Sequence, residues 1–290
     1  MSKVARLIIL CVVLLLGLAT AISLVQPALA AGATTEVHLV KYAEDGSTML
    51  EEKTVSYEWL ENNLPVQGDG VTHRYHQGPV FEGDKWDPDE VTNFKDKGAV
   101  KGTNVKDLCD LVGGMSPGDE VMIRAVDGYH VEYGYTTVYE PLERQGPIVL
   151  CWYNGEDALD GERYGEGYPG KSAYRTAMQI VLFADDSSNP EGKHVFGNWD
   201  MHECLPEKCQ HFYEAYPSTN GLSMKWVDEI RIYTGGYTGE GGKPVKAMPD
   251  DISESGQVPW VPIVGGVVGG LLVIGLAVYF LRRRKVEKAG

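Results

Sequence analysis

Apolar and polar residues between positions 102 and 133 follow a pattern that predicts a short helix and then a β-hairpin. Asn104 can cap the helix, whose apolar side chains recur at three- and four-residue spacing, and Gly113 can end it in a left-handed conformation. Alternation over residues 121–126 and 129–133 then indicates two strands, and Asp127-Gly128 between them is typical of a tight turn. We therefore expect a helix, a turn and a hairpin in one compact unit.

Shorter patterns on either side of this block predict more strands and one more helix. Ser56 can cap the second helix, and a turn at positions 45–46 can reverse the first strand. The expected strands are residues 36–40, 48–55, 147–153, 179–184 and 225–232. In the last strand we expect Trp226 and Ile230 to be buried. The pattern predicts an α+β fold that is mixed and rich in β-strands.

The first 30 residues have the layout of a secretory signal peptide. Lys3 and Arg6 precede an apolar run over residues 7–25, and small residues at positions 28–30 suit cleavage. An uncleaved anchor helix is the alternative interpretation. In both cases we expect the residues that follow to lie outside the cytoplasm.

The C-terminal end predicts a membrane anchor. Residues 259–281 form an uncharged apolar run long enough to cross a bilayer as a helix. The basic tail over residues 282–290 would place that end in the cytoplasm. Residues 235–258 are rich in Gly, Pro and acidic residues, which predicts a flexible stalk. We therefore expect residues 31–234 to form the extracytoplasmic domain of a single-pass cell-membrane protein.

The charge of the chain limits the partners that this domain can have. The net charge is −15, and the two terminal segments hold mostly basic residues, so the part between them is more acidic still. Such a surface repels phosphate groups, which argues against nucleic acid and anionic lipid as partners. This charge is compatible with a small ligand or a partner protein. The contact with the membrane would be made by the C-terminal helix.

A cluster of cysteine and histidine near position 205 has two possible uses. His202, Cys204, Cys209 and His211 form a near-symmetrical H-x-C-x₄-C-x-H pattern. Thiolate and imidazole are ligands that zinc prefers, although the spacing matches no familiar zinc site. A local disulfide between Cys204 and Cys209 is the favoured interpretation for an exported domain, with free thiols and a metal site as alternatives.

Several short motifs, taken in order, resemble the sulfite-oxidase-like molybdopterin-binding family. They are a V-x-D-L helix at residues 105–108, Asp-Gly-Tyr at 127–129, Asn-Gly at 154–155 and Lys-Trp-Val at 225–227. The resemblance covers roughly residues 55–234 and implies the α+β, β-rich fold of that family. Its enzymes oxidise or reduce small oxo-substrates at molybdenum held by a pterin dithiolene and one protein cysteine.

The chain departs from the family pattern where that cysteine would stand. Residues 71–84 contain no cysteine, and the resemblance implies a pocket between this segment and the Gly-rich loop at 161–175. Basic side chains in these two segments are the candidate cofactor-binding residues: His73, Arg74, His76, Arg163, Lys171 and Arg175. Residues three apart on a strand point to opposite faces, so the two histidines would converge on a metal only in a turn. A structural role for both is the alternative.

Three functions follow from these observations. The first is a membrane-anchored extracytoplasmic module that binds a ligand, a cofactor or a partner without the family's catalysis. The second is a molybdenum-cofactor-dependent oxidoreductase with altered metal ligands, such as His73 or His76. The third is a structural or adhesion protein of the cell envelope. Because the thiolate is missing, we expect molybdopterin and molybdenum to be absent, and whether the protein is an enzyme stays open.

Overall fold

The structure is a computed structural model that describes residues 34–89, 91–159, 164–170, 178–186 and 191–239. By its internal contacts the chain divides into two compact units, Met1–Lys243 and Pro244–Gly290, and every described residue lies in the first. The expected signal peptide, transmembrane helix and cytoplasmic tail, and all but the start of the stalk, lie outside the described residues. Within the described part, no helix is both long enough and apolar enough to cross a bilayer.

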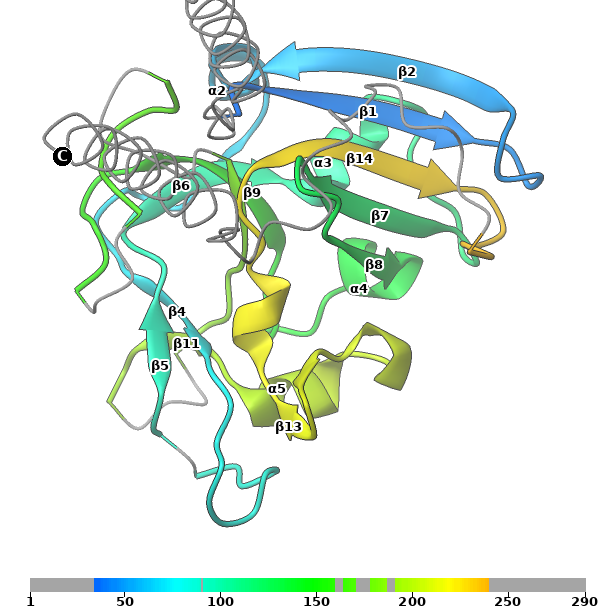
Figure 1. The fold of residues 1–290 in the computed structure, drawn as a ribbon. Coiled ribbons are helices and arrows are strands. Elements are labelled where there is room, and N and C mark those ends of the chain that lie inside the picture. The colour runs from blue at the N-terminus through cyan, green and yellow to red at the C-terminus, as the bar shows by residue number, and fades with distance from the viewer. Residues whose placement is uncertain (1–33, 90, 160–163, 171–177, 187–190, 240–290) are drawn as a thin grey trace, which may run out of the picture. The chain divides into compact units, whose positions relative to one another are not determined.

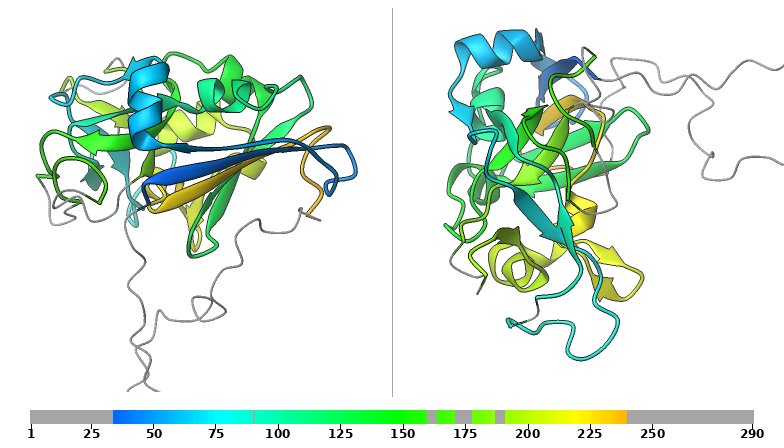
Figure 2. Two further views of the ribbon diagram at one scale, coloured as in Figure 1. Left: turned by 90° about the horizontal axis from the view of Figure 1, so that it is seen from above. Right: turned by 90° about the vertical axis from the view of Figure 1, so that its left-hand side faces the viewer.

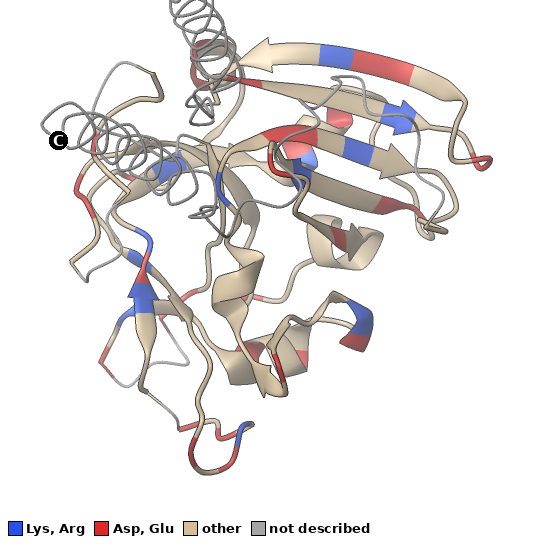
Figure 3. Cartoon of the chain, viewed as in Figure 1, with Lys and Arg blue, Asp and Glu red and all other residues tan. Residues whose placement is uncertain are grey.

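A five-stranded sheet forms one side of the domain, with strand order β2-β1-β14-β7-β8 (Figure 1). Its strands are β1 (Glu36–Tyr42), β2 (Met49–Ser56), β7 (Glu120–Ala125), β8 (His130–Gly134) and β14 (Val227–Tyr233). The first and last strands, β1 and β14, are parallel neighbours, and the other pairs are antiparallel. The long strands run together across one side of the domain (Figure 2), and charged residues of both signs lie on them (Figure 3).

Three smaller sheets complete the β-structure. The four-stranded sheet has the order β10-β9-β6-β3, the three-stranded sheet β11-β4-β5, and β12 pairs with β13. Their strands are β3 (Val66–Gln67), β4 (Arg74–Gln77), β5 (Phe94–Asp96), β6 (Val100–Asn104), β9 (Ile148–Asn154), β10 (Gln179–Leu182), β11 (His194–Phe196), β12 (Phe212–Tyr213) and β13 (Tyr216–Pro217). The predicted α+β class, rich in β-strands, is confirmed.

Short helices connect these sheets. They are α2 (Tyr57–Asn63), α3 (Val105–Asp110), α4 (Tyr135–Tyr139), α5 (Asn198–Cys204) and the 3₁₀ helices η1 (Glu207–Cys209) and η2 (Thr219–Leu222). Both predicted caps are present, because Ser56 Oγ accepts the Trp59 N–H and Asn104 Oδ1 accepts the Lys106 N–H. Each cap satisfies a backbone donor that the first helical turn leaves unpaired.

The main core lies between the five-stranded and four-stranded sheets. Leu39 and Ile123 from the first sheet share one apolar cluster with Leu150 and Trp152 from the second, and all four are fully buried. The indole N–H of Trp152 donates to Thr103 Oγ1 at 2.9 Å, so burial of this large ring leaves no polar atom unpaired. This core fixes how the two sheets meet.

The predicted hairpin is confirmed, but one prediction at β14 is wrong. Gly128 takes a φ of +88° in the turn between β7 and β8, and its N–H donates to Ala125 O at 2.9 Å. Ile230 is buried as expected, whereas Trp226 is only half-buried and has a φ of +56°. The chain bends sharply into β14 at this residue, so its side chain lies at the rim of the domain and not in the core.

Candidate functional site

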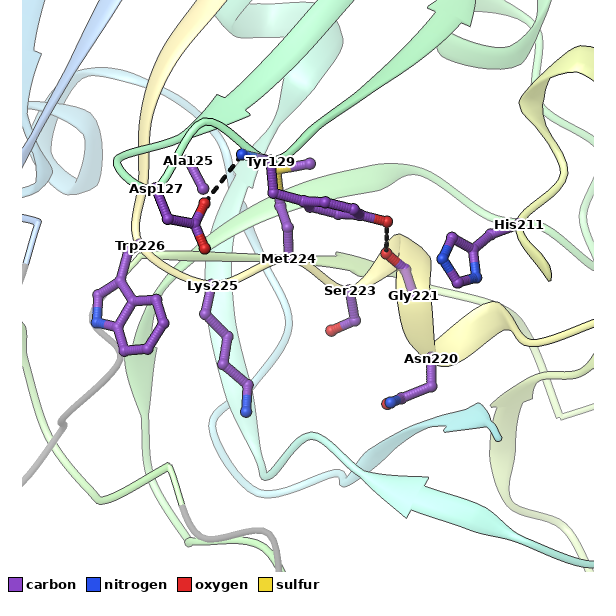
Figure 4. Close-up of a pocket in the computed structure, with 10 residues that line it drawn as sticks. All are labelled: Ala125, Asp127, Tyr129, His211, Asn220, Gly221, Ser223, Met224, Lys225 and Trp226. Carbon is purple, nitrogen blue, oxygen red and sulfur yellow. Dashed lines mark hydrogen bonds between the residues drawn. The ribbon is translucent and has the colours of Figure 1, made fainter. Parts of the chain in front are cut away.

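An open groove of about 330 Å³ lies where the hairpin turn meets the segment between η2 and β14 (Figure 4). Hairpin residues form one wall, and the η2–β14 segment forms the other. The lining residues are Ala125, Asp127, Tyr129, His211, Asn220, Gly221, Ser223, Met224, Lys225 and Trp226. Aromatic surfaces and a few polar groups line the same concave surface, which is the usual composition of a small-molecule site.

One hydrogen bond joins the two walls of the groove, and a second shapes the hairpin wall. Tyr129 Oη donates to Gly221 O at 2.8 Å, and the Tyr129 N–H donates to Asp127 Oδ1 at 3.0 Å. His211 Nδ1 donates to Ser218 O at 3.0 Å, which orients the imidazole. A Cβ at Gly221 would lie about 2.1 Å from the His211 ring, so only glycine allows this close contact.

Polar groups of the η2–β14 segment point to one side of it (Figure 4). Ser223 is only 6% exposed, and its buried Oγ has no hydrogen-bond partner in the described part of the chain. Asn220 Oδ1 accepts from the buried Lys97 ammonium, which leaves the Asn220 amide N–H groups as donors. Lys225 Nζ lies 4.2 Å from the centre of the Tyr164 ring. The groove therefore offers a hydroxyl, an amide and an ammonium close together.

Trp226 adds a strained aromatic residue to the rim. Its φ of +56° lies in the left-handed region, which is costly for a bulky side chain. A hydrogen bond from the Val126 N–H to Trp226 O, at 3.0 Å, holds this backbone conformation. Residues kept in such conformations cluster at ligand sites, because the surrounding structure must stabilise them.

His76, a candidate cofactor-binding and metal-ligating residue, lies in the core. Its Nδ1 donates to Thr219 O at 2.8 Å, and its Nε2 accepts the Leu182 N–H at 3.2 Å. Burial, together with the Lys97 charge, lowers its pKa to about 3, so the ring is neutral. Both ring nitrogens are engaged, which leaves none to coordinate a metal or contact a cofactor.

Two further candidates from the family resemblance, Arg74 and His73, do not line the groove either. Arg74 donates to Ala184 O at 3.0 Å, and its guanidinium lies 4.6 Å from the centre of the Phe183 ring. His73 contacts Asp96 and lies at another site. The remaining candidates, in the loop at 161–175, lie outside the described residues: Arg163, Lys171 and Arg175.

The predicted Cys/His cluster does not converge. The His202 ring stacks on Trp86 with centroids 4.5 Å apart, whereas His211 lies in the groove. Cys204 lies at the end of α5 and Cys209 in η1, against β8. In the portion of the chain that is described, no group of three or more His, Cys, Asp and Glu side chains is placed to hold a metal ion. The metal site proposed for these four residues is therefore not formed.

The structure does not contain the predicted Cys204–Cys209 disulfide, because both residues are free thiols in it. Burial and the Asp200 carboxylate raise the pKa of Cys204 to about 12. Cys209 lies against the Gly134 backbone instead, and burial raises its pKa as well. The two sulfur atoms have different neighbours because Pro206 separates the end of α5 from the turn of η1.

Comparison with known proteins adds no family. No model of a known protein family matches the chain, and no curated protein matches it. The groove residues must therefore be interpreted from their own chemistry. Ser223 and Asn220 were not identified from the sequence. The signal that could have indicated this segment is the short run from Gly221 to Trp226, which contains a glycine, a serine and a Lys-Trp pair.

Proposed function

We propose that residues 31–234 form an extracytoplasmic small-molecule-binding module, anchored to the cell membrane by the helix expected at residues 259–281. The groove beside Tyr129 and Trp226 is its binding site. The observation that carries the proposal is Ser223, whose hydroxyl is buried in the groove without a hydrogen-bond partner among the described residues. A buried hydroxyl without a hydrogen bond costs free energy, and a polar ligand would provide the missing partner.

The chemistry of the groove favours a small ligand with a planar part and an anionic or polar end. Trp226 and Tyr129 offer ring surfaces, and Ser223, Asn220 and Lys225 offer donors. The volume of about 330 Å³ suits a molecule of the size of a single heterocycle with substituents. Because the site is open on one side, binding requires no large rearrangement of the described residues.

The sulfite-oxidase-like fold remains our proposal for the architecture, without the family's catalysis. Molybdenum in that family requires a thiolate, and none of the four described cysteines lines the groove. Cys109 and Cys151 are fully buried, and burial raises the pKa of both thiols. The donor set therefore does not fit the molybdenum centre. Absence of molybdenum stays a prediction.

Binding can be tested on the full-length chain, purified from a host that makes the molybdenum cofactor. Benzoate and phenyl phosphate serve as planar anionic probes, and a rise in melting temperature reports binding to the native state. We expect Ser223→Ala and Lys225→Met to reduce the rise strongly, and Lys193→Met, away from the groove, to leave it unchanged. A rise of equal size in all variants, or no rise with either probe, would contradict the groove as the site.

Two further measurements test the rest of the proposal. Elemental analysis of the same protein should find no molybdenum, whereas near-equimolar molybdenum would favour the oxidoreductase with altered ligands. Protease added to intact cells should remove the domain and leave the C-terminal tail protected. Protection of the domain, under conditions that digest other exposed proteins, would contradict the proposed topology.

A further inference from the structure

A second site, separate from the groove, lies around His73 at the start of β4. Asp96, at the end of β5, lies on one side of the imidazole, and Glu156, which follows β9, lies on the other. The three residues come from distant parts of the sequence and are brought together by sheet pairing. His73 and Asp96 side chains are 12% and 2% exposed, and that of Glu156 is 61% exposed, so the site opens to solvent on the glutamate side.

Asp96 fixes the orientation and the tautomer of His73. Both carboxylate oxygens of Asp96 lie 2.9 Å from His73 Nδ1, so this nitrogen carries a proton and donates it. Asp96 also accepts the N–H groups of Gly98 at 2.8 Å and Leu159 at 2.9 Å, which hold the carboxylate in place. A carboxylate that accepts from one ring nitrogen is the usual partner of a histidine that binds a metal through the other.

The other ring nitrogen, His73 Nε2, is buried and has no hydrogen bond within the described residues. Glu156 Oε2 lies 3.7 Å from it, which is too far for a hydrogen bond. A neutral ring nitrogen that turns its lone pair to a carboxylate is unfavourable, and either a proton on that nitrogen or a metal ion between the two atoms removes the repulsion.

We propose that His73 Nε2 and the Glu156 carboxylate bind a divalent transition-metal ion such as Zn²⁺, with Asp96 as the residue that orients the imidazole. Nitrogen and oxygen ligands bind zinc at about 2.0–2.2 Å, so atoms 3.7 Å apart can share one ion with an angle of roughly 125°. Water would fill the remaining positions. Such an open coordination sphere is typical of catalytic and regulatory ions and not of structural zinc.

A second histidine–glutamate pair provides a matched control. His130 Nε2 lies 3.2 Å from Glu132 Oε1, and its Nδ1 contacts Gly128 O at 3.1 Å. The 3.2 Å distance is that of a hydrogen bond, which leaves no room for an ion between the two atoms. The His130 and Glu132 side chains are 43% and 29% exposed. This pair has an oriented ring but no buried carboxylate behind it and no unpaired nitrogen. It should bind zinc no better than an ordinary surface pair.

The test uses the full-length chain, freed of metal with a chelator and titrated with Zn²⁺ by calorimetry and by thermal melting. We expect one binding event that His73→Gln and Glu156→Gln each weaken at least tenfold, while His130→Gln leaves it unchanged. Asp96→Asn should weaken binding about 10- to 100-fold, the range known for partners of metal-binding histidines. The Glu156 side chain is 61% exposed, and the Glu156 carbonyl, which accepts the Ala99 N–H, is unchanged in Glu156→Gln, so this variant keeps the test valid if the Asp96 variant fails to fold.

Two outcomes would overturn the proposal. One is zinc binding that survives in both the His73 and the Glu156 variants, since the ion would then bind elsewhere on this acidic chain. The other is the lack of any zinc binding to the metal-free chain, since the assigned ligands would then not hold the ion.

Discussion

Two buried polar regions of the domain are stabilised in different ways. The charged cluster lies on the five-stranded sheet and consists of His38, Arg124, Glu229 and Arg231. The neutral network lies between β4, α5 and η2 and consists of Gln77, Asn198 and Thr219, with His76 beside it. Both are largely buried, yet the first contains ions and the second contains none. The comparison shows how buried polar groups can make stability depend on pH with opposite sign.

In the charged cluster, Glu229 is the common partner. Arg231 Nη2 lies 2.7 Å and Arg124 Nη1 3.3 Å from its Oε2, while His38 Nδ1 lies 3.7 Å from its Oε1. Burial alone would raise the pKa of Glu229, but the interactions with His38 and Arg231 lower it to about 2. Glu229 therefore remains ionised over the physiological range, and its charge and those of its partners depend on one another.

In the neutral network, Thr219 is the common hydrogen-bond partner, as Glu229 is in the charged cluster. Its hydroxyl donates to Phe196 O at 2.6 Å and accepts the Gln77 N–H at 2.7 Å, and its own N–H donates to Asn198 Oδ1 at 3.0 Å. These bonds join β4, β11, α5 and η2, and so they also hold the segment that enters the groove. Loss of one hydroxyl would leave two buried backbone groups unpaired.

The largest effect is expected from the loss of one charge in the charged cluster. Glu229→Gln keeps the shape but leaves Arg231 buried without a carboxylate, so we expect a loss of about 3–5 kcal/mol in the free energy of unfolding by urea. The double variant Glu229→Leu/Arg231→Met removes both charges, and its free energy of unfolding should fall much less. If the single and double variants lose equal amounts, charge pairing is not the cause.

A smaller loss is expected from the neutral network. Thr219→Val preserves the volume but removes the hydroxyl, which should lower the free energy of unfolding by about 2–3 kcal/mol because Phe196 O and the Gln77 N–H lose their partner. Thr54→Val, at an exposed position of β2, is the control and should change stability by about 0.5 kcal/mol or less. If Thr219→Val leaves the free energy of unfolding unchanged, the network is not needed for stability.

The histidines of the two regions should respond to pH with opposite sign. The Glu229 carboxylate raises the pKa of His38 above 6.5, so its stabilisation is complete below pH 6.5 and is lost as the pH rises through the folded-state value. Burial lowers the pKa of His76 to about 3, so its contribution is complete above pH 6.5 and is lost as the pH falls towards 3.

Urea unfolding between pH 4 and pH 9 separates the two contributions. His38→Gln should flatten the alkaline side of the stability profile and leave the acid side steep. His76→Gln should do the reverse, with a change in acid-side slope of at most about 1.4 kcal/mol per pH unit, as expected for one proton. Profiles that stay parallel to that of the unchanged chain would show that neither histidine is coupled to folding.

Local elements could be predicted from the sequence because neighbouring residues determine them. The caps at Ser56 and Asn104 and the turn at Gly128 depend on side chains a few positions away, and the structure confirms all three. The long-range contacts could not be predicted in this way. His76 is paired with Thr219, 143 residues away, and this pairing makes it a core residue and not a ligand.

The same limit applies to the groove and to the cysteines. Lys225-Trp226 was singled out from the sequence, but the groove also needs Tyr129 and His211, which only the folded chain brings to it. Trp226 was expected to be buried as part of the last predicted strand, and its φ of +56° could not be inferred from the residues beside it. The spacing of Cys204 and Cys209 permits a disulfide, but α5 and η1 direct the two thiols to different surroundings.

The smallest effect is expected at the hairpin turn, which depends on no buried polar group. Gly128 has a φ of +88°, and a β-branched residue resists this conformation, so Gly128→Val should lower the free energy of unfolding by about 1–2 kcal/mol. Gly134→Val is the matched control, because Gly134 has a φ of −78° and open space where a Cβ would be. Because the penalty is conformational, it should be the same at pH 5 and pH 8, unlike that of the histidine variants. A loss at Gly128 that changes with pH, or an equal loss at Gly134, would show that the turn is coupled to the charged cluster through β7.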